Sequence, residues 1–210
     1  MSLLIGIIIF IPLLIIFFSF FHASHSWNHI LENIFFSYLL KTIILVIGVS
    51  FLSSFMGVAS AWFVTNYNFP GSNYIKWMLI LPLAIPTYIS AYAYSDTIEF
   101  FTPLLIFVRD NFGSDYMALL DTIIVYLTAI FVLSSVLYPY VYLLLRVSFE
   151  TYGNHFIKVS NTLGYSKKES FWKIALPMSR PALVAGLILV TMETLSDFGA
   201  VKHFGIQTFT

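Results

Sequence analysis

Between Phe36 and Val64 the sequence reads FSYLLKTIILVIGVSFLSSFMGVASAWFV, and Lys41 is the one charged residue in this run. A helix needs about 20 apolar residues to cross the roughly 30 Å hydrocarbon core of a bilayer, and the run exceeds that length. Hydrocarbon offers no water to the backbone, so such a run is expected to be helical, and it lacks the alternation typical of barrel strands. The run therefore predicts a membrane-spanning helix.

Four further apolar runs have the same character. They extend approximately over Leu3 to Phe21, Tyr74 to Tyr94, Thr122 to Leu145 and Pro181 to Leu195. The first is longer than the core of a cleaved signal peptide and no basic residue precedes it, so we expect it to be a retained helix. The predicted fold class is an all-α integral membrane protein, a polytopic transmembrane helical bundle with about five spans. Residues 1–35 would hold the first helix and an extracytoplasmic loop, and residues 36–210 the main domain.

Composition supports this fold and excludes several functions. Of the 210 residues, 59% are hydrophobic and 10% are charged, whereas soluble domains carry about 25% charge. Ten basic and ten acidic residues cancel, so no overall field favours nucleic acid as a partner. The absence of cysteine excludes disulfides and thiolate metal sites. The sequence also lacks a phosphate-binding loop, a His-Glu-x-x-His helix and a Gly-x-Ser-x-Gly elbow, so we predict no catalytic residues and no bound cofactor.

The basic residues set the expected orientation. Seven of the ten fall on one side of the predicted bundle, namely Lys76, Arg146, Lys158, Lys167, Lys168, Lys173 and Arg180. Lysine and arginine near the ends of membrane helices tend to remain in the cytoplasm. We therefore expect the amino terminus and the long loop between the fourth and fifth spans to be cytoplasmic.

That long loop, residues 147–177, carries two predicted short helices. Ser166 and Glu169 form a capping box that predicts a helix start at Lys167. Gly164 fits the left-handed position that ends the helix before it. Leu176 precedes Pro177 and is expected to end the second helix, because a proline disfavours helical geometry in the residue before it.

At this loop the sequence resembles the membrane permeases of bacterial binding-protein-dependent ABC importers. Their signature reads Glu-Ala-Ala, three residues, Gly, nine residues, Ile, one residue, Leu-Pro. The matching positions here are Gly164, Ile174, Leu176 and Pro177. Lys158, Val159 and Ser160 stand where the family has Glu-Ala-Ala, so one charge is reversed and the partner surface is expected to differ there. The resemblance implies that this loop couples the bundle to a separate ATPase.

Three further strings are similar to the iron(III) permease subfamily, whose relatives handle thiamine, sulfate, molybdate and polyamines. They are WFVTNYNFPG from Trp62, LPLAIPTYISAYAY from Leu81 and ETLSDFGAVKHFGIQTFT from Glu193. The resemblance implies iron(III) uptake at the bacterial inner membrane. It also implies an ABC ATPase dimer that binds the ATP, a periplasmic substrate-binding protein and a second permease half or subunit as partners. The chain resembles the first of two halves and ends before a sixth helix, so we expect a truncated or split protein.

Four residues are candidates for the translocation path. Glu193 and Asp197 would share one helical face if the fifth helix extends that far, and ionisable groups at membrane depth usually face a cavity or a partner. They could equally tie down the segment that follows through hydrogen bonds. Pro82 and Pro86 each remove a backbone hydrogen bond, which predicts a kink or partial unwinding, either as a gate or as a static bend.

Other patterns favour structural roles. Ser53, Gly57 and Ala61 form a small-residue stripe that permits close approach of another helix. A second group consists of aromatic and histidine residues that are better read as interfacial or packing residues than as metal ligands, so no metal site is predicted. These are His22, His25, His29, Tyr88, Tyr92 and Tyr94.

Two other functions stay open. The same fold could import thiamine, a polyamine or an oxyanion. A non-transporting membrane scaffold or an electron-transfer subunit is the alternative of another class. An electron-transfer subunit would need paired intramembrane histidines for haem, and His155 and His203 fall in or beside loops.

Overall fold

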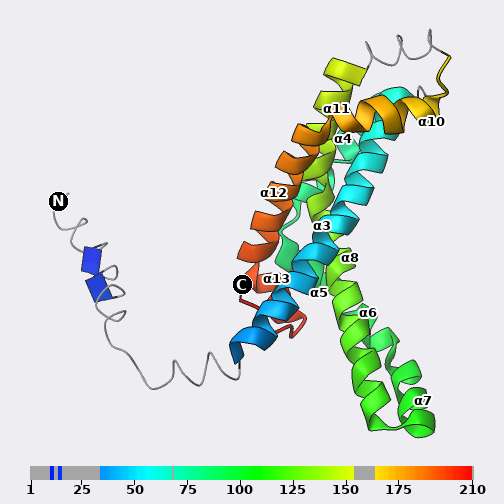
Figure 1. Cartoon of the computed structure of the whole chain (residues 1–210). Coiled ribbons are helices and arrows are strands. Elements are labelled where there is room, and N and C mark those ends of the chain that lie inside the picture. The colour runs from blue at the N-terminus through cyan, green and yellow to red at the C-terminus, as the bar shows by residue number, and fades with distance from the viewer. Residues whose placement is uncertain (1–9, 12–13, 16–33, 68, 154–163, 210) are drawn as a thin grey trace. The chain divides into compact units, whose positions relative to one another are not determined.

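The computed structural model describes residues 10–11, 14–15, 34–67, 69–153 and 164–209, and every regular element in these residues is helical (Figure 1). The chain divides into two compact units, Met1–Leu40 and Lys41–Thr210. In the first unit the described residues are helical, and the rest of the predicted span from Leu3 to Phe21 lies outside the described residues. The elements up to the central helix are α3 (Phe35–Asn66), α4 (Ser72–Met78), the 3-10 turn η2 (Leu81–Ala84), α5 (Thr87–Tyr94), α6 (Asp96–Phe100), α7 (Thr102–Phe112) and α8 (Ser114–Ser148). They are followed by the π-helical turn η3 (Phe149–Gly153), α10 (Lys167–Ser170), the π-helical turn η4 (Phe171–Ala175), α11 (Leu176–Met178), α12 (Arg180–Ser196) and α13 (Phe198–His203).

Membrane-spanning character is present in four places. The helices Phe35–Asn66 and Ser114–Thr151 are each long and apolar enough to cross a bilayer. Two bent pairs have this character when each is taken as one span: Ser72–Ala84 with Thr87–Phe100, bent by 86°, and Lys167–Met178 with Arg180–Ser196, bent by 67°. The described residues thus contain up to four spans, at the positions of the second to fifth apolar runs. The predicted multi-span helical bundle is confirmed.

The packing face of α3 repeats every three or four residues, the spacing of one helical side. Its buried residues are Thr42, Leu45, Val49, Ser53, Gly57, Ala61 and Val64. The predicted small-residue stripe lies on this face, and a Cβ atom on Gly57 would come within 2.7 Å of the Val141 Cβ on α8. The stripe therefore allows α3 to approach α8 closely, as predicted.

Helix α8 provides the centre of the second unit, with α3 and α12 beside it (Figure 1). A Cβ atom on Gly186 of α12 would lie 2.9 Å from the Cα of Val141. The Ser134 hydroxyl donates a buried hydrogen bond to the Val49 carbonyl at 3.2 Å. Most of the largest fully buried side chains come from these three helices, and Val201 is also among them and lies in α13. Those from the three helices are Tyr142, Leu45, Leu133, Leu137, Leu145, Val49, Val132, Val141 and Val190.

The third apolar run is broken at its two prolines. Helix α4 ends at Met78, and Pro82 lies in the short turn η2. Ile85 then has extended geometry, with φ −94° and ψ 120°, and α5 begins at Thr87 after Pro86. A proline disfavours helical geometry in the preceding residue, which explains the extended Ile85. The predicted kink is confirmed.

The expected helix end at Leu176 is wrong. Leu176 has helical angles, the helix continues to Met178, and the bend into α12 lies at Ser179, with φ −89° and ψ 6°. The Leu176 N–H bonds to the Phe171 carbonyl five residues back, which is the wide π-helical pattern. Pro177 then falls at the start of the next short helix, where its missing N–H costs little.

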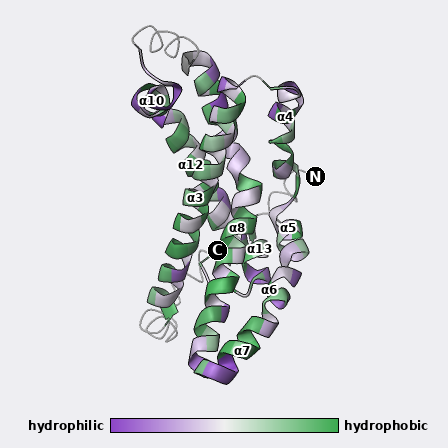
Figure 2. Cartoon of the chain, turned by 90° about the vertical axis from the view of Figure 1, so that its right-hand side faces the viewer, coloured by the Kyte–Doolittle hydropathy of each residue, from purple (hydrophilic) through white to green (hydrophobic). Residues whose placement is uncertain are grey.

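Hydropathy is unevenly distributed along the second unit (Figure 2). Hydrophobic residues dominate α3, α8 and α12, whereas hydrophilic residues gather around α10 and α4 and, at the opposite end of α8, around the turn from α7. Such a band of apolar helix between two polar ends is what a membrane-spanning bundle requires.

Candidate functional site: a docking segment and a translocation path

The segment Lys167–Met178 starts with the predicted capping box. The Glu169 N–H donates to the Ser166 hydroxyl at 3.3 Å, and the Ser166 N–H donates to the Glu169 carboxylate at 3.0 Å. Gly164 has φ 81°, the left-handed geometry predicted for it. The predicted helix start at Lys167 is confirmed. The backbone N–H of Ser166 and then its hydroxyl lower the pKa of Glu169, with a smaller contribution from Lys173.

This segment has one exposed and one packed side. Its exposed residues include Lys167, Lys168, Trp172 and Lys173, and Lys173 forms an ion pair with Glu169 at 3.6 Å. The packed side carries Ser170, with no exposed surface, and Ala175, which is 4% exposed. Among the predicted signature residues, Ile174, Leu176 and Pro177 are half-buried and Gly164 is exposed. The exposed side of this segment is therefore basic and aromatic, and we call Lys167–Met178 the docking segment.

The signature loop is described only in part. Lys158, Val159 and Ser160 lie outside the described residues, so the reversed charge at Lys158 stays a sequence observation. His22, His25 and His29 lie outside them as well.

Contacts that the sequence analysis did not identify attach the docking segment to the bundle. The ring of Phe171 lies 4.8 Å from that of Trp62 on α3, and Trp62 lies edge-on to Phe149 at 5.7 Å between ring centroids. The Ser148 hydroxyl donates to the Ser179 hydroxyl at 2.9 Å, and both residues are buried. Aromatic residues near helix ends are common at membrane interfaces, so their sequence alone carries no signal for this cluster.

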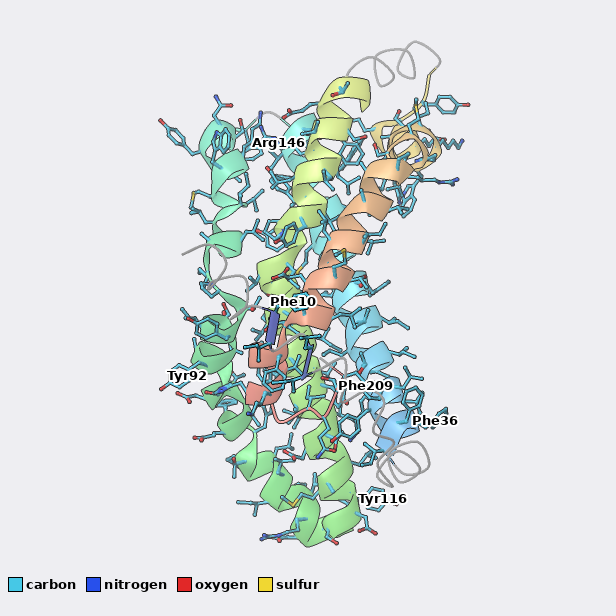
Figure 3. All side chains as sticks on the ribbon, turned by 90° about the vertical axis from the view of Figure 1, so that its left-hand side faces the viewer. Phe10, Phe36, Tyr92, Tyr116, Arg146 and Phe209 are labelled. Carbon is cyan, nitrogen blue, oxygen red and sulfur yellow. The ribbon has the colours of Figure 1, made fainter. Side chains whose placement is uncertain are left out.

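The end of α8 also contacts α4. Arg146 forms an ion pair with Glu150 at 2.9 Å, and its guanidinium lies over the Trp77 ring at 5.7 Å from the centroid. Figure 3 labels Arg146 at this end of the unit. Trp77 is 68% exposed. This is the arrangement of an interfacial tryptophan with a cationic neighbour.

The candidate path residues do not form one cluster on a helix. Helix α12 ends at Ser196, so Glu193 and Asp197 do not share a helical face. Glu193 is an exposed residue of α12, and Asp197 caps α13 by accepting the Ala200 N–H at 3.0 Å. Capping fits the hydrogen-bonding role considered for Asp197. Its second carboxylate oxygen is buried and has no hydrogen-bond partner among the residues that the structure describes.

Helix α13 packs on α5, just beyond the break at Pro82 and Pro86. A Cβ atom on Gly199 would lie 3.4 Å from the Tyr88 Cβ, and the rings of Tyr92 and His203 are 5.8 Å apart. Tyr92 is 71% exposed and extends outward from α5 (Figure 3). Within the described residues no three histidine, aspartate or glutamate side chains gather as metal ligands.

The fold and the apolar spans define a multi-span helical membrane protein, and the basic segment Lys167–Met178 precedes its last apolar helix. The family model described as "Binding-protein-dependent transport system inner membrane component" matches residues 53–209. The chain belongs to this family of ABC importer permeases.

Curated relatives are similar at moderate identity. The sulfate transport system permease protein CysT of Escherichia coli (strain K12) is 29% identical over 154 residues, which are 72% of this chain and 52% of that protein. The Fe(3+)-transport system permease protein FbpB 2 of Haemophilus influenzae is 24% identical over 170 residues, 81% of this chain and 29% of that protein. The molybdenum transport system permease protein ModB of the same organism is 28% identical over 152 residues, which are 71% of this chain and 62% of that protein.

The chain spans about half the length of the CysT relatives that it matches. The expected permease family is confirmed, but the names of the relatives carry three different cargoes, and the iron(III) subfamily is not singled out.

Proposed function

We propose that this chain is the membrane-spanning part of an ATP-driven importer. The observation that carries the proposal is the segment from Gly164 to Met178, which combines the family's glycine-to-Leu-Pro spacing with an exposed basic side and a packed side. An ABC ATPase dimer would bind the exposed side and supply the energy, since the sequence has no phosphate-binding loop of its own. ATP would be bound by that partner.

The other partners follow from the family. A periplasmic substrate-binding protein would deliver the cargo to the end of the bundle opposite the docking segment. A second permease half or subunit would complete the path, and lipid would cover the remaining apolar surface of the spans. With the docking segment in the cytoplasm, the amino terminus would also be cytoplasmic, as the distribution of lysine and arginine predicts.

Two classes of inorganic ion are candidates for the cargo, namely an oxyanion and iron(III). The sulfate permease of Escherichia coli and the molybdenum permease of Haemophilus influenzae are 29% and 28% identical to this chain, which favours an oxyanion. The iron(III) permease relative is 24% identical over 81% of this chain and keeps iron(III) as the second candidate. The relatives described above are not named for thiamine or a polyamine.

Transport would proceed by alternating access, in which a bundle with two states is biased by its partners. The broken span at Pro82 and Pro86 and the packed pair α5 and α13 are the candidate moving parts. Glu193 and Asp197 remain candidates for the path, with Asp197 acting through the cap of α13.

The test uses the chain with its companion subunits in lipid vesicles, with the binding protein outside. ATP-dependent uptake of labelled sulfate and of labelled iron(III) is measured together with ATP hydrolysis. Gly164→Val should uncouple hydrolysis from uptake, because a β-branched residue at φ 81° is strained and would displace the docking segment.

Gly113→Val is the matched control, because Gly113 has φ 100° and open surroundings at the other end of α8. Unchanged coupling in Gly164→Val would contradict the proposal. A scaffold or an electron-transfer subunit would give neither ATP-dependent uptake nor a bound ATPase.

A further inference from the structure

Three aromatic rings meet where the packed side of the docking segment contacts the bundle. Each ring belongs to a different part of the fold. Phe171 comes from the segment itself, Trp62 from α3, and Phe149 from the residue that follows α8. Trp62 contacts both of the other rings, at 4.8 Å from Phe171 and 5.7 Å from Phe149. We call Trp62, Phe149 and Phe171 the aromatic joint.

A buried hydrogen bond fixes the far end of the same segment. Ser179 lies at the 67° bend into α12 and is 1% exposed, and its hydroxyl accepts from Ser148, the last residue of α8. Phe171 against α3 and Ser179 against α8 are thus two of the contacts that hold the segment, and the Lys167 ammonium adds another, 4.9 Å from the centroid of the Tyr67 ring. Movement of the segment is therefore expected to displace these contacts, because close-packed interiors transmit strain.

We propose that the aromatic joint passes movement of the docking segment to α3 and α8, with Trp62 as the positioning residue that joins them. This inference rests on the proposed function, since it requires an ATPase acting on the exposed side. Phe149 is 2% exposed, so its ring is enclosed by other atoms and has little space to move when Trp62 is displaced. A displacement at Phe171 therefore reaches both helices through one side chain.

The geometry separates docking from transmission. The exposed side carries Lys167, Lys168, Trp172 and Lys173, and none of these residues is a member of the joint. Trp172 contacts the joint at Phe171, with 5.1 Å between the ring centroids, so the variants are placed at Trp62. A change at Trp62 leaves that side intact, so the ATPase should still bind. What should fall is the number of ions imported for each ATP hydrolysed.

The experiment compares Trp62→Ala, Trp62→Phe and Phe63→Ala in the complete transporter in lipid vesicles, with uptake and ATP hydrolysis measured together. In Trp62→Ala the ATPase should remain bound and hydrolysis should continue, while ions imported per ATP fall about fivefold or more, the lower range of a typical coupling between sites. Trp62→Phe keeps a ring and should recover much of the ratio. Phe63 is the neighbouring aromatic residue on α3 and is 53% exposed, so Phe63→Ala should leave the ratio unchanged.

Folding is checked by thermal unfolding of each purified variant. Should Trp62→Ala fail to fold, Phe171→Leu and Trp62→Phe test the same joint, and both should lower the ratio, with Phe171→Leu having the larger effect because it removes a ring. An unchanged ratio in folded Trp62→Ala or Phe171→Leu overturns the inference, and so does a parallel loss of uptake and hydrolysis with the ratio preserved. A wild-type transporter that binds no ATPase overturns the proposed function instead.

Discussion

The hydroxyl of Tyr142 donates a hydrogen bond to the backbone carbonyl of Lys76 at 3.0 Å. Tyr142 lies on α8 with no exposed surface, and Lys76 lies in the last turn of α4. Carbonyl groups at the end of a helix have no partner within that helix, so the tyrosine satisfies one of them. The bond thereby ties the first part of the broken third span to the central helix.

Because of this bond, the same tyrosine-to-phenylalanine substitution is expected to have different effects at two positions of α8. Tyr142→Phe should lower the free energy of unfolding by about 1 kcal/mol, because the Lys76 carbonyl loses its donor. Tyr126→Phe should be neutral or slightly stabilising, because the Tyr126 hydroxyl is buried and finds no hydrogen-bond partner in the described part of the chain. Denaturant or thermal unfolding of both variants in detergent measures the difference. Equal losses in the two variants would contradict the assignment.

The close approach of α3 to α8 predicts a steric effect at Gly57. Gly57→Val should destabilise the bundle by about 1–3 kcal/mol, because the new side chain would overlap Val141 and the backbone of Tyr142. Ala59→Val, two residues along the same helix at an exposed position, is the control and should change stability little. Thermal unfolding of the purified chain measures both, and a stable Gly57→Val variant would argue against this packing.

The capping box predicts a pH dependence at the start of α10. Hydrogen bonds from Ser166 hold the pKa of Glu169 below its usual value. The ionised carboxylate therefore stabilises the helix start at pH values above the ordinary carboxyl pKa. This stabilisation is lost as the pH falls through the lowered pKa of the folded state.

Ser166→Ala should raise the pKa of Glu169 part of the way toward its usual value, because the hydroxyl is lost while the backbone N–H of residue 166 still donates, and Lys173→Ala should raise it as well. Titration of the Glu169 carboxyl carbon by NMR measures both. Lys168→Ala serves as a control for the general loss of one positive charge. A larger effect from Lys168→Ala than from Ser166→Ala would mean that overall charge, and not the cap, sets the pKa.

Asp197 offers a test between a structural role and a role for its charge. Asp197→Ala should destabilise α13 by about 1 kcal/mol, because the Ala200 N–H loses its acceptor. Asp197→Asn keeps an acceptor oxygen and should keep both the fold and most of the uptake activity. Unfolding and uptake are measured for the two variants. A folded Asp197→Asn variant without uptake would show that the negative charge acts in transport.

Much of the fold could be predicted from local patterns. Length and hydropathy were sufficient for α3, α8 and α12, because a membrane helix must satisfy its own backbone and therefore extends over the whole apolar run. Ser166 and Glu169 predicted the start of α10, since a capping box depends on residues only three positions apart. Pro82 and Pro86 predicted the broken span for the same local reason.

The sequence did not predict the features that depend on contacts between distant residues. A π-helical turn before Pro177 moved the helix end from Leu176 to Met178, and the wide turn has no clear local signature. The contact of Trp62 with Phe171 joins residues that are far apart in the chain, so one sequence without its relatives gives no indication of it. Glu193 and Asp197 would share a face only if α12 continued as far as Asp197. The exact residue at which a helix ends is difficult to predict from a sequence.

Val141 of α8 lies against a glycine of α3, Gly57, and against a glycine of α12, Gly186. At Gly57 a larger residue would meet the Val141 side chain, and a smaller residue at position 141 would relieve part of that overlap. At Gly186 a new Cβ atom would meet the Val141 Cα at 2.9 Å, and no change of side chain at position 141 removes that atom. Related proteins are therefore expected to keep glycine at position 186, whereas positions 57 and 141 can change together.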